Sequence, residues 1–157
     1  MLSRFDPDRG SEFKGEFTEV LVLDPASPGQ NPNYVLNPAK EAHVKVSWKL
    51  EGRLVPLYVR ALEDPWVIKL FAETMGPGDD LYIATSQVEK GDPAQQKTYE
   101  TTLVIPPYTL KEGNPTSNNS GVYKLVITAF LDSRLGTPGF DISGFTEGPL
   151  IRVENPL

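Results

Sequence analysis

The side chains that could carry out chemistry are few and scattered. The chain has one histidine, His43, and no cysteine, which excludes Cys–His catalysis and any metal site built from thiolates or several histidines. His43 stands on the polar side of an alternating segment, where a lone histidine is far more often solvated than catalytic. No nucleophile-elbow, phosphate-loop or dinucleotide-binding glycine motif occurs. We therefore expect no catalytic residue, no metal site and no cofactor.

The paired carboxylates have simpler explanations than catalysis. Asp79-Asp80 lies in a Gly/Pro turn, and Glu63-Asp64 precedes a proline. Aspartate side chains stabilise turns by accepting hydrogen bonds from nearby backbone N–H groups, and this is the role expected for both pairs. The run Asp6-x-Asp8-x-Gly10-x-Glu12 resembles part of a calcium loop, but it lacks the third oxygen position and the span that a full coordination shell needs. We expect an acidic segment without a bound ion.

Composition narrows the class of protein and of partner. The chain has 157 residues, of which 39% are hydrophobic, enough for one domain with a single core. A net charge of −6 argues against nucleic acid and anionic membrane as partners, because both are bound through Lys and Arg. The N-terminal residues show no apolar run of signal-peptide length, and no stretch could insert into a membrane. We expect a cytoplasmic protein, although export by a dedicated machine would leave no such run.

The residues alternate between apolar and polar in many short segments. Ala42 to Leu50 is the clearest, since every second residue is apolar and the intervening ones are polar. With 15 prolines and 13 glycines the chain is poor in long helices. Strands are predicted over residues 13–23, 34–36, 42–50, 66–73, 81–88, 99–105, 121–131 and 148–154. Residues 54–62 fit a helical turn about as well as a strand, residues 135–147 read as a loop, and residues 1–12 as a flexible arm before a single domain over 13–157.

One segment resembles a known architecture. Asn119-Ser120-Gly121-Val122-Tyr123 is similar to the entry to the sixth strand of immunoglobulin-like domains, where a tyrosine hydrogen-bonds back across the corner of the fold. Trp48 or Trp66 would be the buried tryptophan that such domains often carry. The expected fold is therefore all-β, an antiparallel immunoglobulin-like β-sandwich of about seven or eight strands with one helical turn near 54–62. No specific family is indicated, so no functional residue follows from the resemblance.

The predicted pairing of strands 66–73 and 121–131 leaves an unusual outer face. Their core-facing residues alternate with Val67, Phe71, Val126 and Phe130, which would lie on the side expected to meet water. Apolar patches of this kind mark interaction sites. Loop residues Phe140 and Phe145 could cover the same face or reach a neighbour, and residues 54–62 could also pack across it. The candidate partner-binding residues are therefore Val67, Phe71, Val126, Phe130, Phe140 and Phe145.

These observations favour a non-enzymatic structural or adaptor module. It would mediate protein–protein interaction or self-assembly in a larger bacterial or phage-type complex, with a protein or a second copy as partner and no small-molecule ligand. The alternative is a carbohydrate-binding β-sandwich that stacks sugars on exposed aromatic side chains, for which the candidates are Tyr58, Tyr82, Tyr108 and Phe140.

Overall fold

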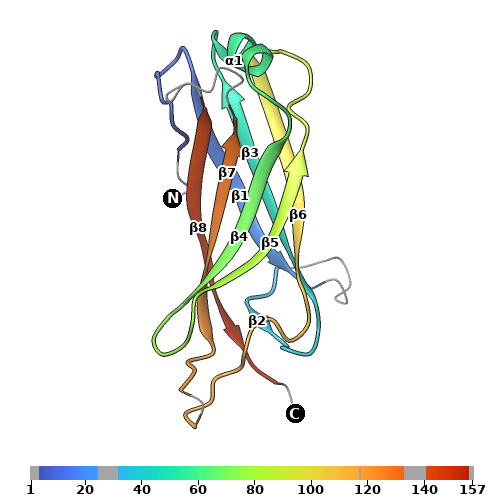
Figure 1. Ribbon diagram of the computed structural model, residues 1–157, viewed down its shortest axis with the longest axis vertical. Coiled ribbons are helices and arrows are strands. Elements are labelled where there is room, and N and C mark those ends of the chain that lie inside the picture. The colour runs from blue at the N-terminus through green and yellow to red at the C-terminus, as the bar shows by residue number, and fades with distance from the viewer. Residues whose placement is uncertain (1–3, 25–31, 117, 133–140, 156–157) are drawn as a thin grey trace.

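The chain forms two β-sheets that share one hydrophobic core. The computed structural model describes residues 4–24, 32–116, 118–132 and 141–155. The described elements are β1 Lys14–Leu23, β2 Val35–Leu36, β3 Ala42–Glu51, α1 Val55–Ala61, β4 Trp66–Thr74, β5 Leu81–Val88, β6 Gln96–Ile105, β7 Val122–Leu131 and β8 Ile142–Val153. The strands run along the long axis of the molecule, with α1 at one end and β2 near the other (Figure 1). The expectation of an all-β protein is confirmed.

The strands are ordered β1-β3-β6 in sheet A and β2-β8-β7-β4-β5 in sheet B. All neighbours pair antiparallel except β2, which runs parallel to the end of β8. Sheet B curls around the core. At one seam between the sheets β5 meets β6, where the hydroxyl oxygens of Ser86 and Thr101 lie 2.5 Å apart. The predicted neighbours 66–73 and 121–131 are β4 and β7, which lie side by side.

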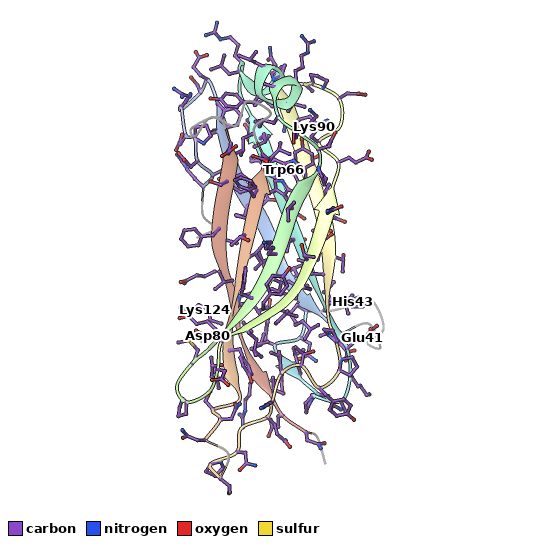
Figure 2. All side chains as sticks on the ribbon, in the orientation of Figure 1. Glu41, His43, Trp66, Asp80, Lys90 and Lys124 are labelled. Atoms are coloured by element: carbon purple, nitrogen blue, oxygen red, sulfur yellow. The ribbon has the colours of Figure 1, made fainter. Side chains whose placement is uncertain are left out.

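The alternation of the sequence decides which side chains enter the core. Ala42, Val44, Val46, Trp48 and Leu50 are buried, and the residues between them in β3 are half-buried. Strands β4 and β7 supply the facing layer, and all nine of their residues expected in the core are buried: Trp66, Ile68, Leu70, Ala72, Tyr123, Leu125, Ile127, Ala129 and Leu131. The rings of Trp48, Trp66 and Tyr99 lie 5.4 to 5.6 Å apart and join the two sheets. Figure 2 shows Trp66 between the sheets near the α1 end.

The segment 54–62, predicted as either a helical turn or a strand, contains the helix α1 from Val55 to Ala61. Pro56 lies in the first turn of α1, where its missing N–H would have no partner inside the helix. Val55, Tyr58 and Val59 are buried, so α1 closes the end of the core, and the helix does not lie on the outer face of sheet B. Within the described residues no helix has the length and apolar character needed to cross a membrane.

Two expectations are corrected at the edges of the fold. The last strand begins at Ile142, so residues 142–147, expected as the end of a loop, are part of β8. The core also begins before Phe13, the expected start of the domain, because Phe5 is only 2% exposed and its ring lies 4.7 Å from that of Phe17. The backbone of Arg4 forms an antiparallel β-bridge with Glu16 of β1, and that of Asp6 forms another with Ser143 of β8. The described part of the expected arm therefore closes the second seam between the sheets.

Candidate interaction surface

Apolar side chains gather on the outer face of sheet B because the register places them in rows. Val67 of β4 lies opposite Phe130 of β7, and Phe71 lies opposite Val126. Strand β8 adds Phe145, which pairs with Thr128. We call the set the outer patch, and it comprises Val67, Phe71, Tyr82, Val126, Phe130 and Phe145.

Tyr82 joins the outer patch through an irregularity in β5. The pairing shifts between Leu70 and Phe71, so that Leu70 lies opposite Ala84 whereas Phe71 lies opposite Tyr82. The rings of Phe71 and Tyr82 meet edge to face, with centroids 5.2 Å apart. Strict alternation would not place Tyr82 on the same face as Thr85 and Gln87, so no signal in the sequence marks this residue as part of the patch.

Three of the four aromatic members of the outer patch are open to solvent. Phe130 is 40% exposed, Tyr82 54% and Phe145 60%, whereas Val67, Phe71 and Val126 are half-buried. Of the two predicted covers, α1 closes the end of the core and residues 142–147 belong to the sheet itself, whereas residues 135–140 lie outside the described residues. Phe140 lies outside the described residues. The structure therefore brings five of the six predicted residues onto one sheet face.

An open groove of about 470 Å³ lies at the end of the outer patch, between Phe130 and Phe145. Asp6 forms one wall through two backbone hydrogen bonds to Ser143, of 2.8 and 2.9 Å. Gly144 also lines the groove, and a Cβ built there would stand 2.5 Å from the ring of Phe5. The aromatic core thus packs directly beneath the groove.

The outer face of sheet A has the opposite character. Lys45 lies 3.4 Å from both Glu19 and Glu100, and Lys49 lies 3.3 Å from Glu16 and 2.6 Å from Glu51. The two lysine ammonium groups have raised pKa values, chiefly from Glu100 at Lys45 and from the hydrogen bond to Glu51 at Lys49. Paired charges in water are typical of a solvated face. The same face also carries Leu21 and Val104, but among the described residues no Phe, Tyr or Trp side chain lies on it, whereas sheet B presents four such rings on its outer face.

Two charges interrupt the outer patch without a partner in the described structure. Lys69 and Glu73 are exposed on either side of Phe71 along β4, and neither forms an ion pair or a side-chain hydrogen bond with a described residue. The cross-strand neighbour of Glu73 is Lys124, whose ammonium group lies 3.4 Å from Glu147 instead.

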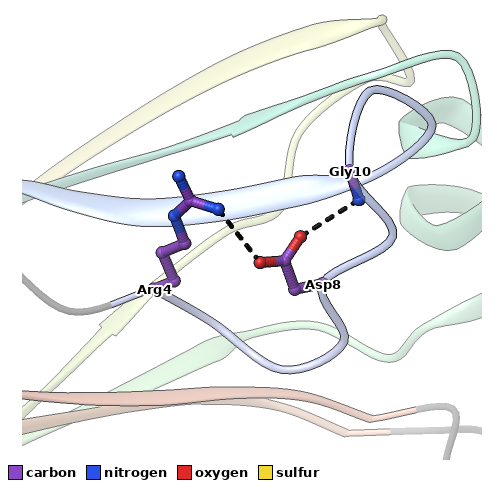
Figure 3. A network of polar contacts seen from close by, with 3 residues as sticks. All are labelled: Arg4, Asp8 and Gly10. Atoms are coloured by element: carbon purple, nitrogen blue, oxygen red, sulfur yellow. Dashed lines mark hydrogen bonds and ion pairs between the residues drawn. The ribbon is translucent and has the colours of Figure 1, made fainter.

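The polar residues considered for chemistry stabilise turns and loops. Asp8 accepts hydrogen bonds from the Gly10 N–H at 3.1 Å and from the Arg4 guanidinium at 3.2 Å (Figure 3). These two bonds, the backbone one first, lower the pKa of the Asp8 carboxyl. Asp80 accepts a 2.9 Å bond from the Thr74 N–H. The described residues contain no group of three or more carboxylate or imidazole side chains placed to hold a metal ion.

Other polar and aromatic candidates lie apart from one another. Asp64 accepts a 2.7 Å bond from the Lys90 N–H, so it joins the segment before β4 to the segment after β5 and does not bond the backbone of its own turn. His43 lies 3.3 Å from Glu41 on the outer side of β3 in sheet A, whereas the outer patch belongs to sheet B. Tyr58 is buried against Phe13, so its ring cannot stack on a sugar. Tyr108 is 77% exposed in the segment after β6 and shares no face with Tyr82.

Comparison with known proteins returns no family model that matches this chain and no curated protein that matches it significantly.

Proposed function

We propose that the chain is a non-enzymatic, immunoglobulin-like β-sandwich module of a larger assembly of bacterial or phage type, acting in the cytoplasm and binding protein through the outer patch. The contrast between the two outer faces carries this proposal. Sheet A carries two ion-paired lysines and no described Phe, Tyr or Trp side chain on its outer face, whereas sheet B exposes three aromatic rings there. Aromatic residues are enriched at the centres of protein interfaces, since they supply a large contact area at low entropic cost.

Local features support the immunoglobulin-like part of the proposal. The Tyr123 hydroxyl accepts a 3.0 Å bond from the Lys111 N–H and donates a 3.3 Å bond to the Lys111 carbonyl, which resembles the tyrosine corner of those domains. Trp48 and Trp66 are both fully buried, on facing sheets. Val46 and Leu125 are buried apolar residues on facing strands, where antibody domains have a disulfide.

The proposal is tested by placing charge in the outer patch. The variant Phe71→Asp/Phe130→Asp puts two carboxylates where an apolar contact is expected and changes no fully buried residue. The matched control is Thr102→Asp/Val104→Asp, which adds the same charge to the outer face of sheet A, on β6. Both variants should keep the circular dichroism spectrum of the parent chain.

The readout is the set of proteins that co-purify with each variant from native cells, together with the mass in solution by light scattering. We expect the patch variant to lose a stoichiometric protein contact, self or foreign, that the control retains. A parent chain that is monomeric and free of bound protein would sink the proposal. Equal binding by both variants would do the same.

A further inference from the structure

The outward residues of β4 form a short line of charge, ring and opposite charge. Lys69, Phe71 and Glu73 point to the same side of sheet B, and successive members are about 7 Å apart along the strand. The two charges are therefore about 13 Å from each other, too far to form an ion pair within the chain. Their near neighbours do not satisfy them, because Lys69 lies between Thr85 and Thr128 in the sheet, and Lys124 beside Glu73 pairs with Glu147.

This arrangement is complementary to itself. A two-fold axis parallel to the sheet, at right angles to the strands and level with Phe71, exchanges the two ends of the line. A second copy placed by that axis sets its Glu73 over Lys69 and its Lys69 over Glu73. Both pairs form at once because a two-fold interface uses the same surface on each copy.

We propose that the partner of the outer patch is a second copy of this chain, packed sheet B against sheet B about that axis. The inference rests on the proposed function and names the occupant of the same face. Phe71 and Val126 lie at the centre, opposite each other in neighbouring strands, and supply the apolar contact. The ion pairs beside them fix the register of one copy on the other, as charges at an interface commonly do.

The available area suits a weak dimer. Four strands of about nine residues cover roughly 500 Å² of sheet face, from the spacing of strands and the rise per residue. Because sheet B curls around the core, its outer face is convex, and two copies would bury at most about 1,000 Å², at or below the lower limit for a specific protein interface. Self-association should appear only at high protein concentration, so the test must extend to high concentrations.

The test exchanges the two charges. Sedimentation of the purified full chain, from micromolar to millimolar concentration, measures the dimerisation constant of the parent, of Lys69→Glu and of Glu73→Lys. Each single variant faces like charges at both contacts, and we expect dimerisation to weaken at least about tenfold. An equimolar mixture of the two variants forms one heterodimer in which both contacts join opposite charges. That mixture should recover the association of the parent, as should the Lys69→Glu/Glu73→Lys chain.

Two further variants control for net charge. Lys40→Glu and Glu89→Lys make the same changes of charge as Lys69→Glu and Glu73→Lys, but at exposed residues away from the outer face of sheet B. Neither control should alter dimerisation. Thermal unfolding of every variant shows whether Glu73→Lys, which places a second ammonium group beside Lys124, disturbs the fold. Lys69→Glu does not contain that change, so its weaker dimerisation tests the charge contacts whatever the result for Glu73→Lys.

A parent chain that stays monomeric to millimolar concentration would overturn the second copy as partner. Failure of the mixture to recover association would overturn the two-fold register. Either result differs from failure of the proposed function, since a foreign protein that binds the parent but not Phe71→Asp/Phe130→Asp would still support an interaction module.

Discussion

Phe5 joins the N-terminal segment to the core, and the variant Phe5→Ala removes that contact. The side chain is 2% exposed, and its ring lies 4.7 Å from Phe17 and 5.8 Å from Trp66. Burial of a phenylalanine contributes about 1.5–3 kcal/mol, and aromatic neighbours add about 0.5–1.5 kcal/mol. Buried Phe→Ala changes cost about 3–5 kcal/mol, and the lower end applies here because Phe5 lies between two isolated bridges and not within a strand, so its segment can move to fill the space. We expect a loss of about 3 kcal/mol.

The assay is urea unfolding followed by tryptophan fluorescence, since both tryptophans lie in the core and one is beside Phe5. The matched control is Phe145→Ala, which removes a ring that is 60% exposed on β8 and should change stability by less than about 0.5 kcal/mol. A loss below about 1 kcal/mol for Phe5→Ala, or equal losses for both variants, would contradict the placement of Phe5 in the core. In that case the neighbouring residue Asp6 would not be held against Ser143 as one wall of the groove either.

Two other predictions concern single hydroxyl groups. Tyr123→Phe removes both hydrogen bonds to the Lys111 backbone and should lower the free energy of unfolding by about 1–3 kcal/mol in the same assay, whereas no loss would show that the corner does not depend on them. Burial raises the pKa of Tyr99 above its ordinary 10.0, so the unfolded chain releases this proton at lower pH than the folded chain does. This contribution to stability is complete below about pH 10 and is lost as the pH rises through the raised pKa. Tyr99→Phe also loses the 2.7 Å bond to the Lys90 carbonyl, so this variant should be less stable than the parent at about pH 7. Above about pH 10 its free energy of unfolding should fall less steeply with pH than that of the parent. An equal slope in both chains would show that Tyr99 does not cause the alkaline loss of stability.

The core could be predicted from the sequence wherever alternation was clean. In β3, β4 and β7 the apolar period of two fixes which face is buried, because a shift of one residue would expose the whole set. The same reasoning predicted the outer patch, since Val67, Phe71, Val126 and Phe130 occupy the remaining face.

The start of the last strand could not be predicted in the same way. Gly144, Gly148 and Pro149 resemble loop residues, yet the strand passes through them because β7 pairs along its length and the pairing shifts at Gly148 and Pro149. Proline is tolerated there since no described strand pairs with the outer side of β8 at that position.

Single residues without a periodic context were also missed. Phe5 stands alone in a polar segment, and its burial depends on a space left by Gly15 and Gly144, which lie far apart in the sequence. Tyr82 depends on a register shift that no local pattern encodes. Both positions are set by packing between distant segments, which alternation does not report.

The central claim is that the outer face of sheet B contacts protein and that of sheet A does not. A photo-crosslinking amino acid introduced in turn at position 130, on β7, and at position 102, on β6, compares the two faces directly in native cells. Our account predicts a discrete protein adduct from position 130, of twice the chain mass if the partner is a second copy, and none from position 102. Adducts of equal yield from both positions, or none from position 130, would contradict it.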